Sequence, residues 1–256
     1  MDETGENFSD ATGSALSQES RPAVVEAREH VSLNGVHVMA AATVRAHLAG
    51  GEEEWSRFAM HWEDLSQDRY ASERGTCRLR RYGRFSLTPA TGDLSQLPHC
   101  PFVQPDRSNP LYVDVVRHFD PLTNAFAADP LLRSVVSLLG HVAGALDSAP
   151  DWIVKVHPFR VVAAADGEGQ PTPEGRHRDG VTLVSSLLVG RSNAIGGRST
   201  VVTADGAELL STTLEEPATL LLSDDRSTLH GVSPIRPLDP ARPAHRDVLV
   251  TTLTPA

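Results

Sequence analysis

The sequence contains little cysteine and no long apolar run. Its 256 residues include two cysteines, Cys77 and Cys100, which are too few for a disulfide framework and fit a reducing, cytoplasmic setting. No apolar run is long enough for a membrane-spanning helix, so no membrane contact is expected. The first residues contain neither the basic segment nor the apolar core of a secretory signal, so no signal peptide is expected.

Positive charge is also scarce. The chain carries 23 Lys and Arg against 33 Asp and Glu, which gives a formal net charge of −10. Proteins that bind the nucleic-acid backbone need a basic surface, so nucleic acid is not an expected partner. The sequence gives no indication of an oligomeric state.

Composition divides the chain into a tail and one domain. Residues 1–22 are rich in Ser, Gly, Glu, Asp and Thr, and they predict a disordered acidic tail. Residues 23–256 form a single expected domain. Within it we expect a helical or mixed accessory part at 23–150 and a β-rich core at 151–256.

The accessory part shows two periodic stretches. Residues 36–65 repeat apolar side chains at three- and four-residue spacing, which predicts helix. Residues 79–87 alternate, which predicts a strand. A basic and aromatic face of this strand either contacts an anionic substrate or is solvated and ion-paired. That face carries Arg78, Arg80, Tyr82 and Arg84.

Two further features precede the core. Residues 92–110 form a long Pro-rich loop, a candidate lid over a site. Asp129 followed by Pro130 predicts the start of a helix, with Asp as the N-cap.

From Trp152 onward, short apolar stretches alternate with Gly, Pro, Asp and Asn. Many short strands with turn signals between them favour a sandwich or barrel. The expected strands are 152–164, 181–189, 199–203, 208–213, 218–222, a short one around His230, and 247–253.

A histidine and an aspartate two positions apart occur three times. The pairs are His118 with Asp120, His177 with Asp179, and His245 with Asp247. In a strand such residues point to the same side, so they can present an imidazole and a carboxylate to one point. A lone pair is more often a surface feature without metal. Only the middle pair precedes an expected strand and a later histidine, His230. Two histidines and one carboxylate make the facial triad of non-haem Fe(II) oxygenases.

These motifs resemble those of a known family. The segment from about His157 to the C-terminus is similar to the double-stranded β-helix core of Fe(II)/2-oxoglutarate-dependent dioxygenases. More narrowly, it resembles the free amino-acid oxygenases related to L-isoleucine 4-hydroxylase. The residues that carry the resemblance are Pro173–Gly175, His177–Gly180, Asn193, Gly196–Thr200, His230–Val232 and Arg246–Leu249. The first 150 residues match loosely, mainly through Arg81–Phe85.

The resemblance implies a double-stranded β-helix (jelly-roll) fold and a set of cofactors. His177, Asp179 and His230 would bind Fe(II), with 2-oxoglutarate as cosubstrate and O2 as oxidant. Arg246, sixteen positions after His230, would pair with the far carboxylate of 2-oxoglutarate, because a guanidinium matches a carboxylate in bidentate geometry. Val248 stands where many oxygenases have Ser or Thr, and Arg236 is the reserve candidate.

The resemblance also implies a small amino-acid substrate. We expect Arg160 to hold its carboxylate, with Asn193 and Arg84 as further contacts. An internal ion pair for Arg160 and a turn role for Asn193 remain open alternatives.

The expected activity is hydroxylation of a free L-amino acid, most simply an aliphatic one, with release of succinate and CO2. Three alternatives stay open. They are a related oxygenase on a carrier-bound or peptidyl residue, an outcome of desaturation or ring closure, and a cupin-like metal-binding protein without turnover.

Overall fold

The computed structural model describes residues 21–48, 50–73, 75–103, 115–165 and 167–256. Helix α1 (Arg21–Asn34) begins at the start of the first range. It therefore includes the last two residues of the expected tail, and residues 1–20 lie outside the described part. Residues 104–110 of the expected lid also lie outside it.

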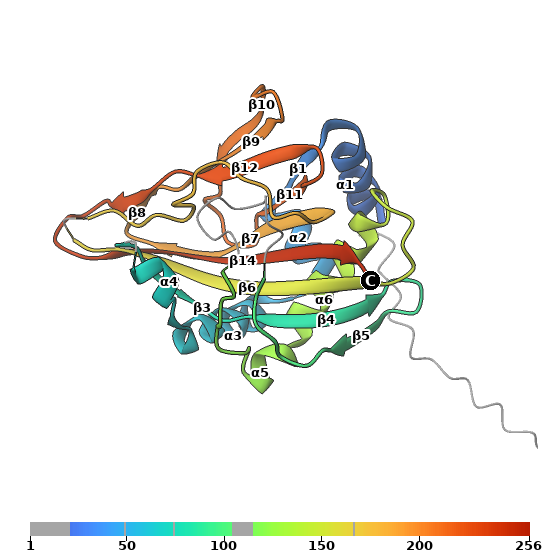
Figure 1. Ribbon diagram of the computed structural model, residues 1–256, viewed down its shortest axis with the longest axis horizontal. Helices are drawn as coiled ribbons and strands as arrows, with labels where there is room; N and C mark the ends of the chain where they lie inside the picture. Colours follow the sequence, from blue (N-terminus) through green and yellow to red (C-terminus); the bar gives the residue numbers. More distant parts are fainter. Residues whose placement is uncertain (1–20, 49, 74, 104–114, 166) are drawn as a thin grey trace, which may run out of the picture.

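A nine-stranded antiparallel sheet is the centre of the molecule (Figure 1). Its main path runs through β1 (Val36–Met39), β11 (Leu220–Asp224), β7 (Leu183–Ser192), β14 (Ala244–Pro255), β6 (Trp152–Ala163), β3 (Cys77–Arg80) and β2 (Ser66–Gln67). Beside β6 also lies β4 (Gly83–Thr88), which pairs with β5 (Asp93–Gln96). The stretch expected as one strand at 79–87 is thus two strands, both paired to β6.

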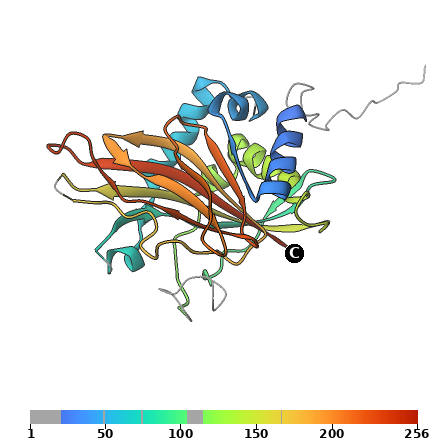
Figure 2. The same ribbon diagram turned by 90° about the horizontal axis from the view of Figure 1, so that it is seen from above.

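Helices cover one face of this sheet (Figure 2). Apolar side chains of the sheet, such as Val154 and Leu249, pack there against those of α6, such as Val135 and Leu139. Helix α6 has the predicted start, because Asp129 accepts a hydrogen bond of 2.8 Å from the backbone N–H of Leu131. The helical elements after α1 are α2 (Ala41–Leu48), α3 (Glu52–Met60), the 3-10 helix η1 (His61–Asp64), α4 (Arg69–Ser72), α5 (Asn124–Ala127) and α6 (Pro130–Ala143).

Two smaller sheets lie over the other face (Figure 1). One has the order β10 (Glu208–Thr213), β9 (Arg198–Thr203), β12 (Thr228–Val232). The other pairs β13 (Ile235–Pro237) with β8 (Ala194–Gly196). The facing antiparallel sheets form the expected double-stranded β-helix.

The N-terminal half also contributes to the large sheet. Strand β1 pairs with β11, so Val36–Met39 is extended although the apolar spacing of 36–65 predicted helix. An edge of the sheet offers hydrogen bonds that a local helix pattern cannot reveal. Residues on both sides of the expected boundary near 150 therefore belong to one sheet. Within the described ranges, no helix has the length and apolar character needed to cross a bilayer.

Candidate metal centre and its cavity

His177 and His230 meet because their backbones form one rung between neighbouring segments. The N–H of each donates to the carbonyl oxygen of the other, at 2.9 Å in both directions. His230 lies in β12, and His177 lies in the loop before β7. Residues directly opposite on an antiparallel rung present their side chains on the same side. The two imidazole rings are accordingly 4.5 Å apart between centroids.

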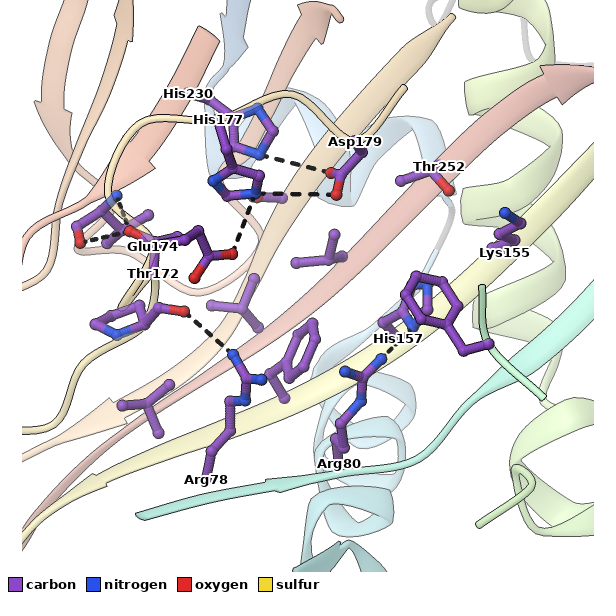
Figure 3. A pocket seen from close by; sticks show the side chains of 18 of the residues that line it. Arg78, Arg80, Lys155, His157, Thr172, Glu174, His177, Asp179, His230 and Thr252 are labelled. Carbon is purple, nitrogen blue, oxygen red and sulfur yellow. Dashed lines mark hydrogen bonds and ion pairs between the residues drawn. The ribbon is translucent and has the colours of Figure 1, made fainter. Parts of the chain in front are cut away.

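Asp179 is held beside the two histidines by a second carboxylate, that of Asp225, which the sequence did not indicate. Asp225 accepts hydrogen bonds of 2.7–3.0 Å from the backbone N–H groups of Asp179, Gly180 and Val181. Strand β7 begins only at Leu183, so Asp225, and not a strand, fixes the loop that carries Asp179. The carboxylate of Asp179 lies 3.6 Å from Nε2 of His230 and 3.9 Å from Nε2 of His177 (Figure 3).

The donor set fits a metal ion. One ligand atom from each of His177, Asp179 and His230 lies within 4.8 Å of the other two, and no other such group occurs in the described residues. The Nδ1 of His177 lies 3.1 Å from the carbonyl oxygen of Gly175, which fixes the ring and leaves Nε2 for a metal. The Nδ1 of His230 lies 3.7 Å from Asp225. Burial lowers the pKa of His230 to about 4, so this imidazole is neutral near pH 7, as a ligand must be.

The charges around His177, Asp179 and His230 also favour a bound cation. Burial and the neighbouring charge of Asp179 raise the pKa of Asp225 to about 6. Glu174, from the Pro173–Gly175 motif, places its carboxylate 3.5 Å from Nε2 of His177. Several acidic groups gathered around two imidazoles favour a divalent cation between them.

A cavity opens beside these residues, between the large sheet and the loop that holds His177. It contains about 1010 Å³ of empty space, part of which is open to solvent. Its floor consists of alternate residues from two central strands of the sheet, which include Lys155, His157, Phe159 and Val161 of β6 and Arg246, Val248, Val250 and Thr252 of β14.

Arg246 reaches this cavity as a buried cation. Only 4 % of the residue is exposed, and its Nε and Nη2 atoms have no hydrogen-bond partner within the described part of the chain. Burial, together with Arg191, lowers the pKa of Arg246 to about 10. A buried guanidinium without an acceptor is costly, which suits a site that receives a carboxylate. Arg236, the reserve candidate, is instead exposed and paired with Glu168.

The opposite wall is basic and aromatic, and it comes from β3. Arg78 and Arg80 face the cavity and share the buried carboxylate of Asp68, at 2.7 Å and 3.8 Å. Arg80 also lies 2.7 Å from Nδ1 of His157, and its guanidinium stacks 3.6 Å from the centre of the Phe119 ring. Figure 3 shows both arginines across the cavity from His177 and Glu174.

The expectation for Arg160 is corrected by its position. Arg160 lies on the helix-covered face of β6, where it pairs bidentately with Asp247 at 2.8 Å and with Glu63. It does not line the cavity. Both faces of this sheet are buried. The position of Arg160 on the same strand face as several valines therefore did not reveal which face holds the site. The alternative of an internal ion pair agrees with the structure.

Asn193 and Arg84 are also outside the cavity lining. Asn193 has a positive φ of 53° and accepts a hydrogen bond from the N–H of Asp239, so it has the turn role left open above. Arg84 lies on the cavity face of the sheet, opposite Lys155, but its guanidinium donates to Sγ of Cys100 at 3.0 Å.

Of the basic face that alternation predicted, Arg78 and Arg80 line the cavity and Arg84 does not. Arg78 and Arg80 could have been chosen from the same pattern. Asp225, Arg117 and Lys155 had no signal of their own, because their positions depend on pairings between distant segments. The other two His–Asp pairs take no part in the centre: Asp120 accepts a hydrogen bond from Ser66, and Asp247 pairs with Arg160.

The chain as a whole is similar to known proteins. The model of the 2OG-Fe dioxygenase family matches residues 59–252. A curated L-isoleucine-4-hydroxylase from Bacillus thuringiensis is 25% identical over 199 residues, which cover 76% of this chain and 80% of that protein.

Solved structures show the same architecture. A BsmA homologue from Methylobium petroleophilum is 34% identical, with a TM-score of 0.83 over 91% of this chain and 96% of that one. The structure of IDO from Bacillus thuringiensis has a TM-score of 0.75 at 20% identity, over 91% of this chain and 99% of that one.

Proposed function

Because this chain belongs to the 2OG-Fe dioxygenase family, whose members use Fe(II), 2-oxoglutarate and O2, we propose that it hydroxylates a C–H bond of a free L-amino acid. An aliphatic amino acid is the first candidate, and succinate and CO2 are the expected coproducts. The observation that carries this proposal is one cavity that joins three candidate metal ligands to a buried, unsatisfied arginine. The similarity to an L-isoleucine-4-hydroxylase supports the amino-acid class.

In this proposal His177, Asp179 and His230 hold the iron. Three protein ligands leave positions open for other molecules. Bound iron, with 2-oxoglutarate and O2, supplies the oxidation of an unactivated C–H bond. Burial keeps the imidazole of His230 neutral beside Asp225, and the carbonyl oxygen of Gly175 fixes the ring of His177.

Arg246 receives the far carboxylate of 2-oxoglutarate. Its unsatisfied Nε and Nη2 atoms face the cavity that the ligand atoms border. The apolar side chains of Val248 and Val232 line the same cavity. Val248 occupies the position where Ser or Thr is common, so the guanidinium itself provides the carboxylate contacts.

The remaining cavity orients the substrate. Phe102, Phe159 and Val250 provide apolar surface for an aliphatic side chain. Orientation of the reacting C–H bond toward the metal supplies much of the rate, because a bound near-attack geometry removes an entropic barrier. The family is one of enzymes, so a metal-binding protein without turnover is set aside.

The proposal is tested by a screen of the common L-amino acids for stimulated succinate formation, with the products analysed by mass. The expected result is stimulation by one or a few aliphatic amino acids, each converted to a product heavier by one oxygen atom. A product lighter by two hydrogens would instead indicate desaturation or ring closure. Stimulation by a carrier-bound or peptidyl residue alone would contradict the proposal.

A further inference from the structure

The cavity has a cation at each end of the central strands. Arg246 and Thr252 both face the cavity from β14, and the strand register pairs them with Val161 and Lys155 of β6. Six residues along an antiparallel strand correspond to about 20 Å, so Arg246 and Lys155 belong to opposite ends. Figure 3 shows Lys155 and Thr252 on the Asp179 side of the metal centre.

One cosubstrate cannot occupy both ends. A five-carbon diacid that reaches the metal ligands from Arg246 is far too short to extend to Lys155 as well. The cation at the Lys155 end therefore requires another explanation.

The surroundings of Lys155 favour the binding of an anion. It is half-buried, and in the described part of the chain no carboxylate forms an ion pair with it. Its ammonium nitrogen lies 5.5 Å from the centre of the Phe102 ring. Burial, together with the neighbouring guanidinium of Arg84, lowers the pKa of Lys155, although the charge of Asp179 acts in the opposite direction. Keeping a charge here is costly unless a negative group binds.

A second cation approaches the same ring. The guanidinium of Arg117 lies 4.8 Å from the centre of Phe102, and the residue is 3 % exposed. The backbones of Phe102 and Arg117 are joined by two hydrogen bonds of 2.7 Å and 3.0 Å, so the ring and this cation move as one unit. Two cations beside one aromatic ring make a rigid, partly dry border for a bound anion.

We propose that Lys155, together with Arg117 around the Phe102 ring, binds the carboxylate of the substrate, and that the enzyme therefore requires a free acid. This inference rests on the proposed function and deepens it. A short amino acid held by its carboxylate at Lys155 directs its remaining atoms toward the space beside Asp179. A carrier thioester, a peptide bond or an amide in place of the carboxylate offers Lys155 no charge.

The test compares acids with amides on the enzyme loaded with Fe(II) and 2-oxoglutarate under exclusion of O2. Calorimetric titration of L-isoleucine, L-leucine, L-valine and their amides gives dissociation constants without turnover. We expect the best-bound acid to bind roughly 30-fold or more tightly than its amide. In Lys155→Met, which keeps the length of the side chain, acid binding should weaken by a similar factor, and amide binding should change by less than about 3-fold.

Matched variants separate a specific effect from a general one. Lys155→Arg should retain the preference for the acid. Arg236→Met, which removes an exposed arginine outside the cavity lining, should leave both constants unchanged. Titration of 2-oxoglutarate should give the wild-type constant in Lys155→Met, which also shows that this variant is folded.

Four results would overturn the inference. A Lys155→Met enzyme that still prefers the acid would remove Lys155 from carboxylate binding. Weaker 2-oxoglutarate binding in that variant, with amino-acid binding unchanged, would make Lys155 a cosubstrate residue. A wild-type enzyme that binds acid and amide equally tightly, while an amino acid still stimulates succinate formation, would reject the free-acid requirement alone. If no acid or amide binds or stimulates succinate formation, the proposed function fails together with this inference.

Discussion

Arg246 is the residue whose chemistry is most constrained by its surroundings. It is buried, charged and lacks acceptors for two of its nitrogen atoms among the described residues. Such a group stabilises neither the fold nor the strand that carries it until an anion binds. Its position on the cavity floor gives that anion a defined place.

Replacement of Arg246 by Met should raise the 2-oxoglutarate concentration needed for half-maximal activity by a factor of roughly 30 or more, because a buried carboxylate would lose its partner. Iron binding should remain, since Arg246 contacts none of the candidate ligands. Steady-state titration of 2-oxoglutarate measures the first effect, and metal content measures the second. An unchanged titration would assign the cosubstrate to another cation of the cavity, with Lys155 the next to test.

Asp225 is a residue whose role becomes visible only in three dimensions. Asp225→Asn would retain the shape of the side chain but weaken its hold on the N–H groups of residues 179–181 and on the ring of His230. Changes next to ligands typically cost about 10- to 100-fold in metal affinity. Competition with a metal chelator should show a loss in this range. Wild-type affinity would mean that the loop before β7 is held by other contacts.

The sequence was sufficient to select the middle His–Asp pair and His230 as neighbours in space, because only they combine the motif with a later histidine. It was insufficient for Arg160, Asn193 and Arg84. The alternation along β6 correctly groups Arg160 with the residues that share its face. However, one face of that strand packs against helices and the other lines the cavity. Alternation identifies which residues share a face and leaves open what that face contacts.

At the scale of elements, Asp68 joins helix α4 to strand β3. Its side chain accepts from the N–H of Ala71 as the N-cap of α4 and pairs with Arg78 and Arg80 on the cavity wall. It is completely buried. Loss of one carboxylate would thus leave two buried arginines without their shared partner.

Asp68→Asn should lower the free energy of unfolding by about 3–5 kcal/mol, as is typical when one side of a buried ion pair is removed. Urea denaturation measures the loss. Glu52→Gln is the matched control, because Glu52 pairs with Arg45 on the surface and its side chain is 84% exposed; its cost should stay below about 1 kcal/mol. Equal effects in both variants would contradict the structural role of Asp68.

The same residue predicts a pH dependence. Burial raises the pKa of Asp68, but the charges of Arg78 and Arg80 outweigh burial and keep this pKa below the usual range. A lowered pKa stabilises the fold above the unfolded-state value, and that stabilisation disappears as the pH falls through the folded-state value. Unfolding free energies of the wild type should therefore decrease below about pH 4, and those of Asp68→Asn should decrease less.

For the elements themselves, some strands of the core were predicted closely, others such as β7 and β14 only to within two or three residues, and β8 and β13 were not predicted. Alternation and turn residues placed β6 and β10 within one residue of their observed ends. The predicted helix at 36–65 was wrong for Val36–Met39, which pairs with β11 some 180 positions later. Local spacing favours a helix there, and only the free edge of the sheet selects the strand.

At the scale of the whole molecule, two layers serve different purposes. The helices and the adjacent face of the large sheet enclose the main apolar core. The opposite face and the smaller sheets enclose the cavity. The large sheet therefore separates the apolar core from the cavity, because its strands present core residues to one side and site residues to the other.

This arrangement links metal binding to global stability. Ligand binding to the folded state alone adds about 2.7 kcal/mol when the ligand is present at one hundred times its dissociation constant. Fe(II) with 2-oxoglutarate should raise the melting temperature of the wild type under exclusion of O2, and a chelator should reverse the shift. His230→Ala should melt at the same temperature with and without the metal. A shift of equal size in that variant would place the metal elsewhere.

In the proposed function, the metal centre of His177, Asp179 and His230 directs an oxygen atom from O2 into a free amino acid. Isotopically labelled O2, supplied together with Fe(II), 2-oxoglutarate and the amino acid that best stimulates succinate formation, tests this most directly. We expect an amino-acid product that carries one labelled oxygen atom for each succinate formed, and no labelled product from His230→Ala. Succinate formed without any labelled amino acid, or labelled product at the wild-type rate from His230→Ala, would contradict it.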